Sequence, residues 1–494
     1  MPRRFHWTLA GIVVAASALR LYRLGHFSYD IDEIFQGFWI RGDWAFFWRS
    51  LRLDAVHPPL DYLLDRLALL ARPSNEMLKV VPLLWGAATV AALGVLVARR
   101  AGEPAGLAAA AVLAFAPYHI RYSQELRPYA LGALLLLLSL YALDRFLERP
   151  RAARLALTYL TFLATMYALY LAAVVLAIAA AAMLFEDAAD ADVIRRSAAR
   201  RFLAWSPVFG AILCFGYLPW WPVVLEAARR PPFVPVEPLT APRLGQILSF
   251  FAFAPVDGEP LRRGTVFLWS LAALGAALAL GRPRQRMLVV WCVAGWGAVE
   301  ILGQIHPHFH GTRRFLPAGI AATALAGIAL GELLRRPVTR IAGTLMLSVV
   351  LVLSSRNLVR YFRDGRADWR PLVAALRREA PPHERIFTEN QASAYCVAFY
   401  LVGPEWLYQA SGGGTPARSI VSLGAGAELL NRAWWPGHPS WLVLGCHPAS
   451  ERLRKWAVRL PCRTFPTAED AALCALDPSQ RDASLALLSE THGP

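Results

Sequence analysis

The sequence predicts a polytopic α-helical membrane protein with about eleven transmembrane helices and a small α/β domain at its C-terminal end. Of its 494 residues, 56% are hydrophobic and only 17% are charged, whereas soluble domains are usually about one quarter charged. Uncharged runs long enough to cross a bilayer as helices recur along the first 354 residues. The remaining residues instead alternate short strand-like and helix-like segments.

Basic clusters between the apolar runs set the predicted topology. Arg3 and Arg4 indicate a cytoplasmic N-terminus by the positive-inside rule. The long run 155–185 decides whether the number of crossings before residues 195–201 is even or odd. Only two crossings within this run return those basic residues to the cytoplasm. The apolar runs are 7–24, 78–98, 104–117, 128–143, 155–185, 202–222, 266–281, 287–303, 315–333 and 341–354. We therefore expect a multi-pass protein of the bacterial inner membrane with an extracytoplasmic C-terminal domain.

The net charge of +16 does not indicate a nucleic-acid-binding protein. Such a protein gathers its basic residues on one accessible face, whereas here they form short clusters between apolar runs, as in cytoplasmic loops. The first apolar run is followed by Arg20 and Arg23 without a small-residue cleavage site. We therefore expect an uncleaved first helix and not a signal peptide.

The predicted domain boundary separates a membrane domain, residues 1–354, from an extracytoplasmic α/β domain, residues 355–494. The second domain is expected to contain helices at 369–378, 391–401, 428–435 and 450–458, and strands at 385–388, 419–423 and 441–444. It holds four cysteines, and an oxidising compartment permits disulfides. We expect at least one disulfide, with Cys462 and Cys474 as the first choice, although sequence alone leaves the pairing open.

The first outer loop begins with an acidic segment. Asp30, Asp32 and Glu33 precede a predicted aromatic helix at 34–51 that suits the membrane interface. Asp30 or Asp32 could simply cap this helix while Glu33 favours its dipole. A catalytic or binding role is the alternative, and residue type alone does not decide between them. Farther on, His57 opens the turn His-Pro-Pro-Leu.

The short second outer loop is dense in charge. It reads Tyr-Ser-Gln-Glu-Leu-Arg-Pro-Tyr and carries Gln124, Glu125 and Arg127. Snorkelling arginines and a local ion pair could explain the basic residues. They explain Glu125 and Gln124 less well, because carboxylates close to hydrocarbon are costly and are usually paired or functional. A substrate-binding role is therefore the competing interpretation.

The last outer loop carries arginines on the side that the inside rule disfavours. Arg313 and Arg314 therefore indicate an anionic partner, since a guanidinium group matches a phosphate. The alternating histidines His306, His308 and His310 are candidate ligands of a divalent metal ion. No further ligand pattern supports that site, so no cofactor is assigned with certainty.

Together these loops suit sugar transfer from a lipid phosphate. That reaction needs a base for the acceptor hydroxyl and positive charge for the departing phosphate. The motifs also resemble those of the GT-C superfamily of integral-membrane glycosyltransferases. The nearest groups are the bacterial protein-mannosyltransferase-like enzymes, including the aminoarabinose transferase of lipid A and rhizobial galacturonosyltransferase-like proteins. The resemblance rests on Asp32-Glu33, the His57 turn, the second-loop motif and Arg314-Phe315-Leu316-Pro317.

The resemblance covers residues 7 to about 333 and implies a polyprenyl-phosphate-sugar donor, an envelope acceptor and inversion at the sugar. It implies a catalytic role for Asp32, where the family has its catalytic carboxylate, and a phosphate contact for Arg314. Phe315 departs from the family, in which tyrosine is commoner at that position. Glu125 and Arg127 match a motif whose role is less settled. Metal use varies in the superfamily and is not carried over.

Two other classes of function compete with this interpretation. A transporter or flippase of lipid-linked sugars would place charges or broken helices near the membrane midplane, whereas the notable charges here lie in predicted outer loops. A non-catalytic protein that binds lipid-linked sugars for envelope assembly would keep the arginines but would not need Asp32. Activity of an Asp32→Asn variant distinguishes these classes.

Overall fold

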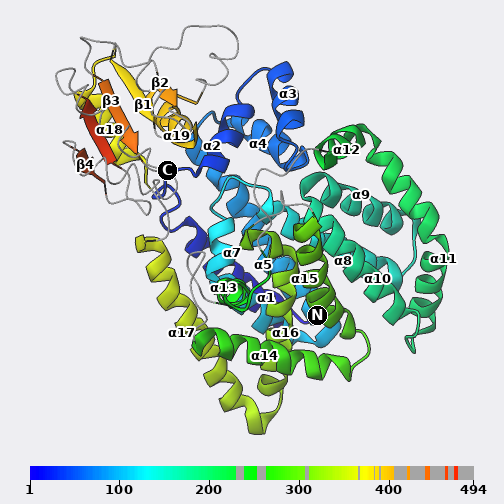
Figure 1. Ribbon diagram of the computed structural model, residues 1–494. Helices are drawn as coiled ribbons and strands as arrows, with labels where there is room; N and C mark the ends of the chain where they lie inside the picture. The colour runs from blue at the N-terminus through cyan, green and yellow to red at the C-terminus, as the bar shows by residue number, and fades with distance from the viewer. Residues whose placement is uncertain are drawn as a thin grey trace. The chain divides into compact units, whose positions relative to one another are not determined.

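A computed structural model describes residues 1–229, 238–252, 263–305, 311–364, 368–382, 384–388, 391–404, 420–422, 440–444, 462–465 and 472–476. Its contacts divide the chain into two units (Figure 1). The helical unit comprises Met1–Leu24 and Leu51–Arg363, and the mixed unit comprises Gly25–Ser50 and Asp364–Pro494. The first part of the first outer loop, Gly25–Ser50, thus belongs by its contacts with the C-terminal part of the chain, whereas the part with His57 belongs to the helical unit.

The helical unit is built from long apolar helices joined by short connections. Seven helices among the described residues are long and apolar enough to span a membrane. The helices are α1 (Arg3–Leu21), α4 (Leu60–Ala71), α5 (Asn75–Ala101), α6 (Glu103–Phe115), α7 (Pro117–Tyr122), α8 (Tyr129–Glu148), α9 (Ala152–Ala168), α10 (Tyr170–Asp187), α11 (Val193–Gly216), α12 (Trp221–Arg229), α13 (Ala241–Ala252), α14 (Arg263–Leu280), α15 (Arg286–Ile305), α16 (Leu316–Arg335) and α17 (Arg340–Asp364), with 3-10 turns η1 (Leu218–Trp220), η2 (Thr312–Phe315) and η3 (Pro337–Thr339).

Each predicted crossing corresponds to one of these helices, and the division of the run 155–185 into two is confirmed. Helix α9 ends at Ala168, Leu169 has extended dihedrals (φ −156°, ψ 118°), and α10 begins at Tyr170. The turn between α5 and α6 is equally sharp. Gly102 takes φ 95°, which glycine adopts without a Cβ clash, and Pro104 then starts α6 with its fixed φ.

Helix α16 forms the centre of the helical unit. Every residue from Leu316 to Gly331 is buried. Small residues let the neighbouring backbones approach closely, as is usual between membrane helices. A Cβ added at Gly331 would lie 2.4 Å from the Ala105 backbone of α6, and one at Gly275 of α14 would lie 1.8 Å from the Leu325 carbonyl oxygen. The packing of α6, α14 and α16 therefore depends on these glycines.

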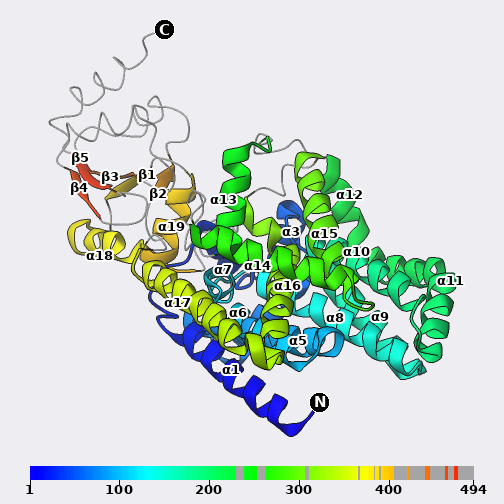
Figure 2. The same cartoon turned by 90° about the horizontal axis from the view of Figure 1, so that it is seen from below.

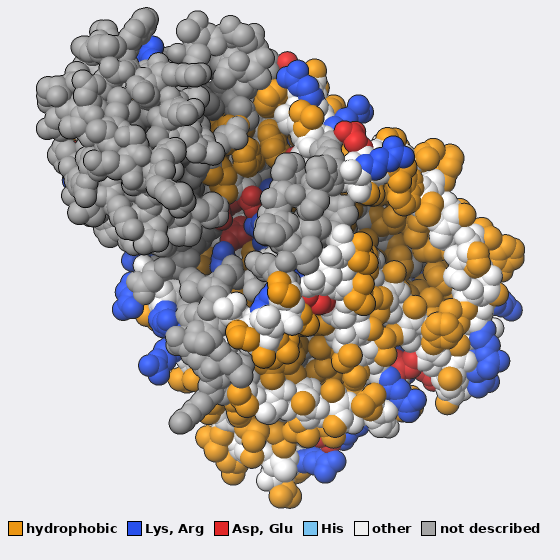
Figure 3. All heavy atoms as spheres, viewed as in Figure 1, with side chains coloured by type: hydrophobic (Ala, Val, Ile, Leu, Met, Phe, Trp, Pro, Cys, Tyr) orange, Lys and Arg blue, Asp and Glu red, His pale blue; other side chains and the backbone are white. Residues whose placement is uncertain are grey.

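The outer helices of this unit expose apolar side chains. Trp205, Ile212 and Phe215 of α11 are each at least half exposed, as are Ile341 and Val352 of α17. Hydrophobic side chains cover much of the described face of this unit in Figure 3, with Lys and Arg side chains toward its margins. This surface suits contact with lipid, since hydrocarbon and not water is then the solvent.

A buried ionic cluster joins one set of helix ends in the helical unit. Asp144 of α8 has no exposed side-chain surface and lies 2.6 Å from Arg99, 2.9 Å from Arg100 and 3.0 Å from Arg195. Arg100 also pairs with Asp187 of α10 at 2.8 Å. Since the arginines belong to α5 and α11, the cluster ties four helices together at the ends that the charge rule assigns to the cytoplasm.

The mixed unit contains α2 (Ile31–Trp39), most of α3 (Trp44–Asp54), α18 (Arg370–Glu379), α19 (Gln391–Leu401) and a five-stranded sheet of order β2-β1-β3-β5-β4. Strand β1 (Arg385–Thr388) pairs in parallel with β2 (Ile420–Ser422) and β3 (Ser440–Leu444). Strands β5 (Ala472–Leu476) and β4 (Cys462–Thr464) continue the sheet antiparallel. The predicted elements at 369–378, 385–388, 391–401, 419–423 and 441–444 are confirmed, while the predicted helices 428–435 and 450–458 lie outside the described residues.

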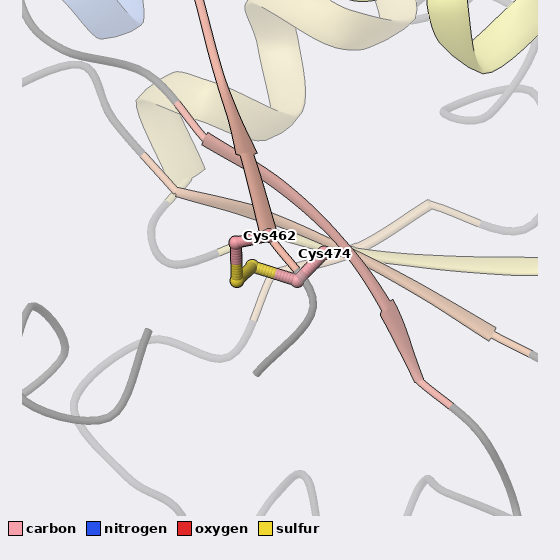
Figure 4. Close-up of a disulfide and its surroundings, with 2 residues drawn as sticks. All are labelled: Cys462 and Cys474. Atoms are coloured by element: carbon pink, nitrogen blue, oxygen red, sulfur yellow. A yellow bond between two sulfur atoms is a disulfide. The ribbon is translucent and has the colours of Figure 1, made fainter. Parts of the chain in front are cut away.

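A disulfide joins the two strands that the sequence did not predict. Cys462 of β4 and Cys474 of β5 are direct cross-strand partners and are bonded to each other (Figure 4). The expected pairing is therefore confirmed. The strands themselves escape prediction because β4 is short and β5 is rich in alanine, which is depleted in strands.

Candidate functional site

The acidic segment of the first outer loop forms a capping box at the start of α2. Asp30 is the N-cap, and its carboxylate accepts the Ile31 N–H at 2.5 Å. The Glu33 carboxylate reaches back to accept the Asp30 N–H at 2.9 Å, and Glu33 is buried. This reciprocal arrangement satisfies amide donors that the first helical turn leaves open. Asp32, in the same turn, is half-buried and takes no part in the capping box.

The predicted single helix 34–51 is wrong. The segment forms two helices, α2 and α3, separated near Gly42 and Asp43. Asp43 accepts the Phe46 N–H at 2.7 Å, so its side chain caps the start of α3. A glycine followed by a capping residue interrupts the helix although the aromatic pattern continues across it.

Three sequence-distant motifs meet around Tyr129 in the helical unit. The ring of His57 makes an edge contact with Tyr129, with centroids 5.6 Å apart. Tyr122 of the second loop lies 5.1 Å from the same ring. The guanidinium of Arg313 lies 5.9 Å from the Tyr129 centroid, within cation–π range. The histidine turn, the second loop and the last loop are thus brought together by one tyrosine that begins α8.

Gln124 has a structural role in the second loop. Its amide nitrogen donates to the carbonyl oxygens of Arg20 (2.8 Å) and Tyr22 (3.1 Å), and its amide oxygen accepts the Tyr361 hydroxyl at 3.1 Å. It therefore connects the end of α1 to the end of α17, and the two ends lie side by side in Figure 2. Arg23 also donates to the Phe362 carbonyl at 2.7 Å.

The local ion pair considered for the second loop is present. Arg121, near the end of α7, donates at 3.0 Å to Glu125, which lies four residues later beyond the helix and is buried. Arg127 is also buried, and its backbone N–H donates to the Glu125 carbonyl at 2.8 Å. The loop thus holds its carboxylate against a cation, as the cost of charge near hydrocarbon requires.

Arg314 pairs with a carboxylate from a neighbouring transmembrane helix. Its guanidinium makes a short ion pair with Glu300 of α15 and lies 4.8 Å from the Phe315 ring. Gln304 donates to Glu300 at 2.7 Å, and Arg243 of α13 lies 4.0 Å from the same carboxylate. Sequence reasoning missed Glu300 because it treated residues 287–303 as a purely apolar span. A lone carboxylate in such a span is the signal that could have revealed it.

A buried arginine supports the second loop from α1. Arg20 donates to the Ser123 hydroxyl at 3.1 Å and to the carbonyls of Ala16 and Ala114, and it lies 2.6 Å from Nδ1 of His119. Burial, together with the Arg20 charge, lowers the pKa of His119 well below its usual value. The imidazole is therefore neutral at physiological pH and can accept this hydrogen bond.

The metal hypothesis has no support among the described residues. No group of three or more His, Cys, Asp or Glu side chains in that part of the chain could hold a metal ion. The candidate ligands His306, His308 and His310 lie outside the described residues. The described part of the last loop includes its two cations, Arg313 and Arg314.

Comparison with solved structures identifies the fold. The chain resembles ArnT from Cupriavidus metallidurans bound to undecaprenyl phosphate, with a TM-score of 0.55 and 13% identity over 94% of this chain and 97% of that chain. It also resembles the Archaeoglobus fulgidus oligosaccharyltransferase AglB in complex with an inhibitory peptide and a dolichol-phosphate, with a TM-score of 0.52 and 11% identity over 90% of this chain and 69% of that chain. The chain has the GT-C fold.

The expected resemblance to the GT-C superfamily is thereby confirmed. A family model described as dolichyl-phosphate-mannose-protein mannosyltransferase matches residues 56–220. This stretch begins just before the His57 turn, includes the second-loop motif and ends at η1. No curated protein sequence matches the chain.

Proposed function

We propose that this GT-C protein transfers a sugar from a polyprenyl-phosphate donor to an envelope acceptor, with inversion at the sugar. The proposal is supported by the fold and by the names of similar proteins. One similar structure has undecaprenyl phosphate bound, and another is in complex with a dolichol-phosphate. The description of the matching family model names dolichyl-phosphate-mannose. The observation that carries the proposal is the combination of this fold with an outer-loop carboxylate and arginine-bearing loops.

The proposed reaction is a single displacement. Asp32 accepts the proton of the acceptor hydroxyl while the hydroxyl oxygen attacks the anomeric carbon. The bond from that carbon to the phosphate oxygen breaks, and the phosphate leaves with the electron pair. Arg314 or Arg313 stabilises the phosphate charge, since guanidinium groups match phosphate oxygens. Glu33 is better explained by the capping box than by catalysis.

The acceptor is a lipid, a glycan or a protein of the cell envelope. Mass spectrometry of envelope lipids and glycans from cells with and without the protein tests the proposal. A sugar substituent that is present only with the protein supports it. Identical profiles under conditions where the protein accumulates in the membrane would contradict it.

The buried ionic cluster argues against the transporter alternative. A transporter that alternates its access opens the helix ends at both sides of the membrane in turn. Here four helix ends are joined by ion pairs around Asp144 and Asp187, neither of which has exposed side-chain surface. Opening that end would separate buried charges, which is strongly unfavourable.

The Cys462–Cys474 disulfide supports an extracytoplasmic mixed unit, because such bonds persist in oxidising compartments. We expect that these two thiols in the unfolded, non-reduced protein resist alkylation, whereas Cys214 and Cys292 react after unfolding. Prior reduction should make all of them reactive. Peptide mass spectrometry measures this, and alkylated Cys462 and Cys474 without reduction would contradict the proposed location.

Undecaprenyl phosphate binding should depend on Arg314. Replacing Arg314 alone would leave the half-buried Glu300 carboxylate beside the more distant Arg243, 4.0 Å away, so the double variant Arg314→Gln/Glu300→Gln is the cleaner test. We expect its affinity for undecaprenyl phosphate to fall by about 10–150-fold, because a charge-assisted bond contributes about 1.5–3 kcal/mol. Native mass spectrometry of the purified full-length protein measures the affinity.

The control removes an ion pair from the opposite end of α16, where the arginine is exposed. Arg335→Gln/Glu332→Gln deletes one arginine and its carboxylate partner, 3.3 Å apart. It should leave binding unchanged. If the Arg314 variant also binds normally, the phosphate contact lies elsewhere, and Arg313 and Arg127 are the next residues to test.

A further inference from the structure

The acidic segment of the first outer loop is fastened to the C-terminal part of the mixed unit by hydrogen bonds. The Tyr29 N–H, directly before Asp30, donates to the Tyr400 hydroxyl of α19 at 2.5 Å. The Trp369 N–H donates to the Ser28 hydroxyl at 3.2 Å. Arg370 donates to the Gly25 carbonyl at 2.7 Å and also to the His26 carbonyl. The approach to α2 is thus held over several consecutive residues.

Helix α2 itself packs against α19 through aromatic side chains. The rings of Phe35 and Tyr395 have centroids 4.7 Å apart, and those of Phe38 and Phe399 are 5.4 Å apart. Tyr29 lies 5.5 Å from Phe399. Such pairs prefer edge-to-face geometry and contribute beyond the area that they bury. Asp32 is carried on the first turn of a helix whose later residues, from Phe35 to Phe38, contact α19.

The contact between the two helices leaves no spare room. A Cβ added at Gly37 would lie 3.1 Å from a ring carbon of Phe399, which is tighter than ordinary van der Waals contact. Gly37 is in the middle of α2, where glycine lowers helix stability relative to other residues. Its presence is therefore explained by the close approach of α19 and not by the needs of α2 alone.

The Tyr400 hydroxyl is suited to a fixed structural contact. Burial raises the pKa of Tyr400 above its usual value, and the nearby charge of Glu33 raises it further. The phenol therefore stays neutral at physiological pH and can accept the Tyr29 N–H. The same hydroxyl thus accepts a hydrogen bond from the backbone before Asp30 and interacts electrostatically with the Glu33 carboxylate of the capping box.

We propose that α19 positions the catalytic carboxylate, with Tyr400 as a positioning residue for Asp32. The inference rests on the proposed function, in which Asp32 is the base. It assigns to the C-terminal part of the mixed unit a supporting role in the reaction, because its contacts hold α2 and the segment before it. A base that is displaced by about 1 Å can lose about 10²-fold in rate.

Two variants of the full-length protein test the proposal. Gly37→Leu inserts a wedge against Phe399 while raising helix propensity, so a loss of activity would not come from a weaker α2. We expect it to reduce product by about 10²-fold. Tyr400→Phe removes only the hydroxyl, and we expect a fall of about fivefold, as for loss of one hydrogen bond. Gly11→Leu is the matched control, because Gly11 also lies inside a helix, α1, and a Cβ there meets nothing within 4 Å.

Three measurements separate the possible outcomes. Hydrogen–deuterium exchange of residues 29–40 should rise in Gly37→Leu and Tyr400→Phe but not in Gly11→Leu. Binding of undecaprenyl phosphate should stay unchanged in all three, which distinguishes positioning of the base from loss of the donor site. The sugar-modified envelope component, measured per amount of membrane-inserted protein, should fall only in the first two.

An Asp32→Asn strain separates this inference from the function on which it rests. If Asp32→Asn abolishes product while Gly37→Leu raises exchange and keeps full product, the positioning role is overturned and the proposed function stands. If exchange does not rise in Gly37→Leu, the docking itself is overturned. If Asp32→Asn keeps full product, both the proposed base and the positioning inference are wrong.

Discussion

Asp32→Asn is expected to reduce sugar transfer by about 10²–10⁴-fold, the usual contribution of a general base. The amide preserves the size and shape of the side chain but cannot accept the proton of the acceptor hydroxyl. Folding should be unaffected, because the capping box at the start of α2 is made by Asp30 and Glu33. The measurement is the amount of sugar-modified envelope component per amount of membrane-inserted protein.

The neighbouring carboxylates provide matched controls. Asp30→Asn keeps an N-cap of equal quality, and Glu33→Gln keeps the reciprocal bond of a capping box. Both variants should transfer sugar at nearly the wild-type rate. Near-normal transfer by Asp32→Asn would remove Asp32 from the mechanism, and a selective loss in Glu33→Gln would assign the base to Glu33 instead.

Asp144→Asn should destabilise the helical unit strongly. Three arginines lie within 3.0 Å of the buried Asp144 carboxylate, and removing its charge leaves buried cations partly uncompensated. Breaking a buried pair in this way typically costs about 3–5 kcal/mol. We expect a clearly lower midpoint of thermal unfolding for the purified protein in detergent.

Glu148→Gln is the control for this variant. Glu148 pairs with Arg99 at 3.1 Å on the same helix as Asp144, but its side chain is 37% exposed. Exposed pairs contribute about 0–1 kcal/mol, so its unfolding midpoint should change little. Equal shifts in the two variants would show that burial does not determine the strength of this cluster.

The sequence predicts the helical unit well because its signals are local. Apolar runs and basic clusters depend only on neighbouring residues, and they correctly divide the run 155–185 into two helices, whose boundary at Leu169 comes from the structure. The capping pattern is local as well, although sequence alone does not decide between Asp30 and Asp32, and the dihedrals and hydrogen bonds of Asp30 identify it as the N-cap. A repeated aromatic pattern was less informative, since it concealed the break at Gly42 and Asp43.

The candidate site is harder to predict because its contacts are distant in sequence. Nothing local in Tyr129 indicates that His57, Tyr122 and Arg313 would surround it. Glu300 was hidden within an apolar run, and its partner Arg314 was expected to contact a phosphate. The structure shows instead that Arg314 already has a protein carboxylate beside it. Any phosphate contact must therefore share or replace that pairing.

The joining of α2 to α19 also has a consequence for the order in which the protein matures. Tyr29 and Tyr400 are separated by 371 positions, so α2 leaves the ribosome long before its partner helix is synthesised. Contacts of such long sequence separation form late, after the loop between them has been closed. The growing chain can therefore insert its whole helical bundle while the acidic segment still lacks its support. A chain that stops before α19 should be inserted in the membrane and yet be inactive.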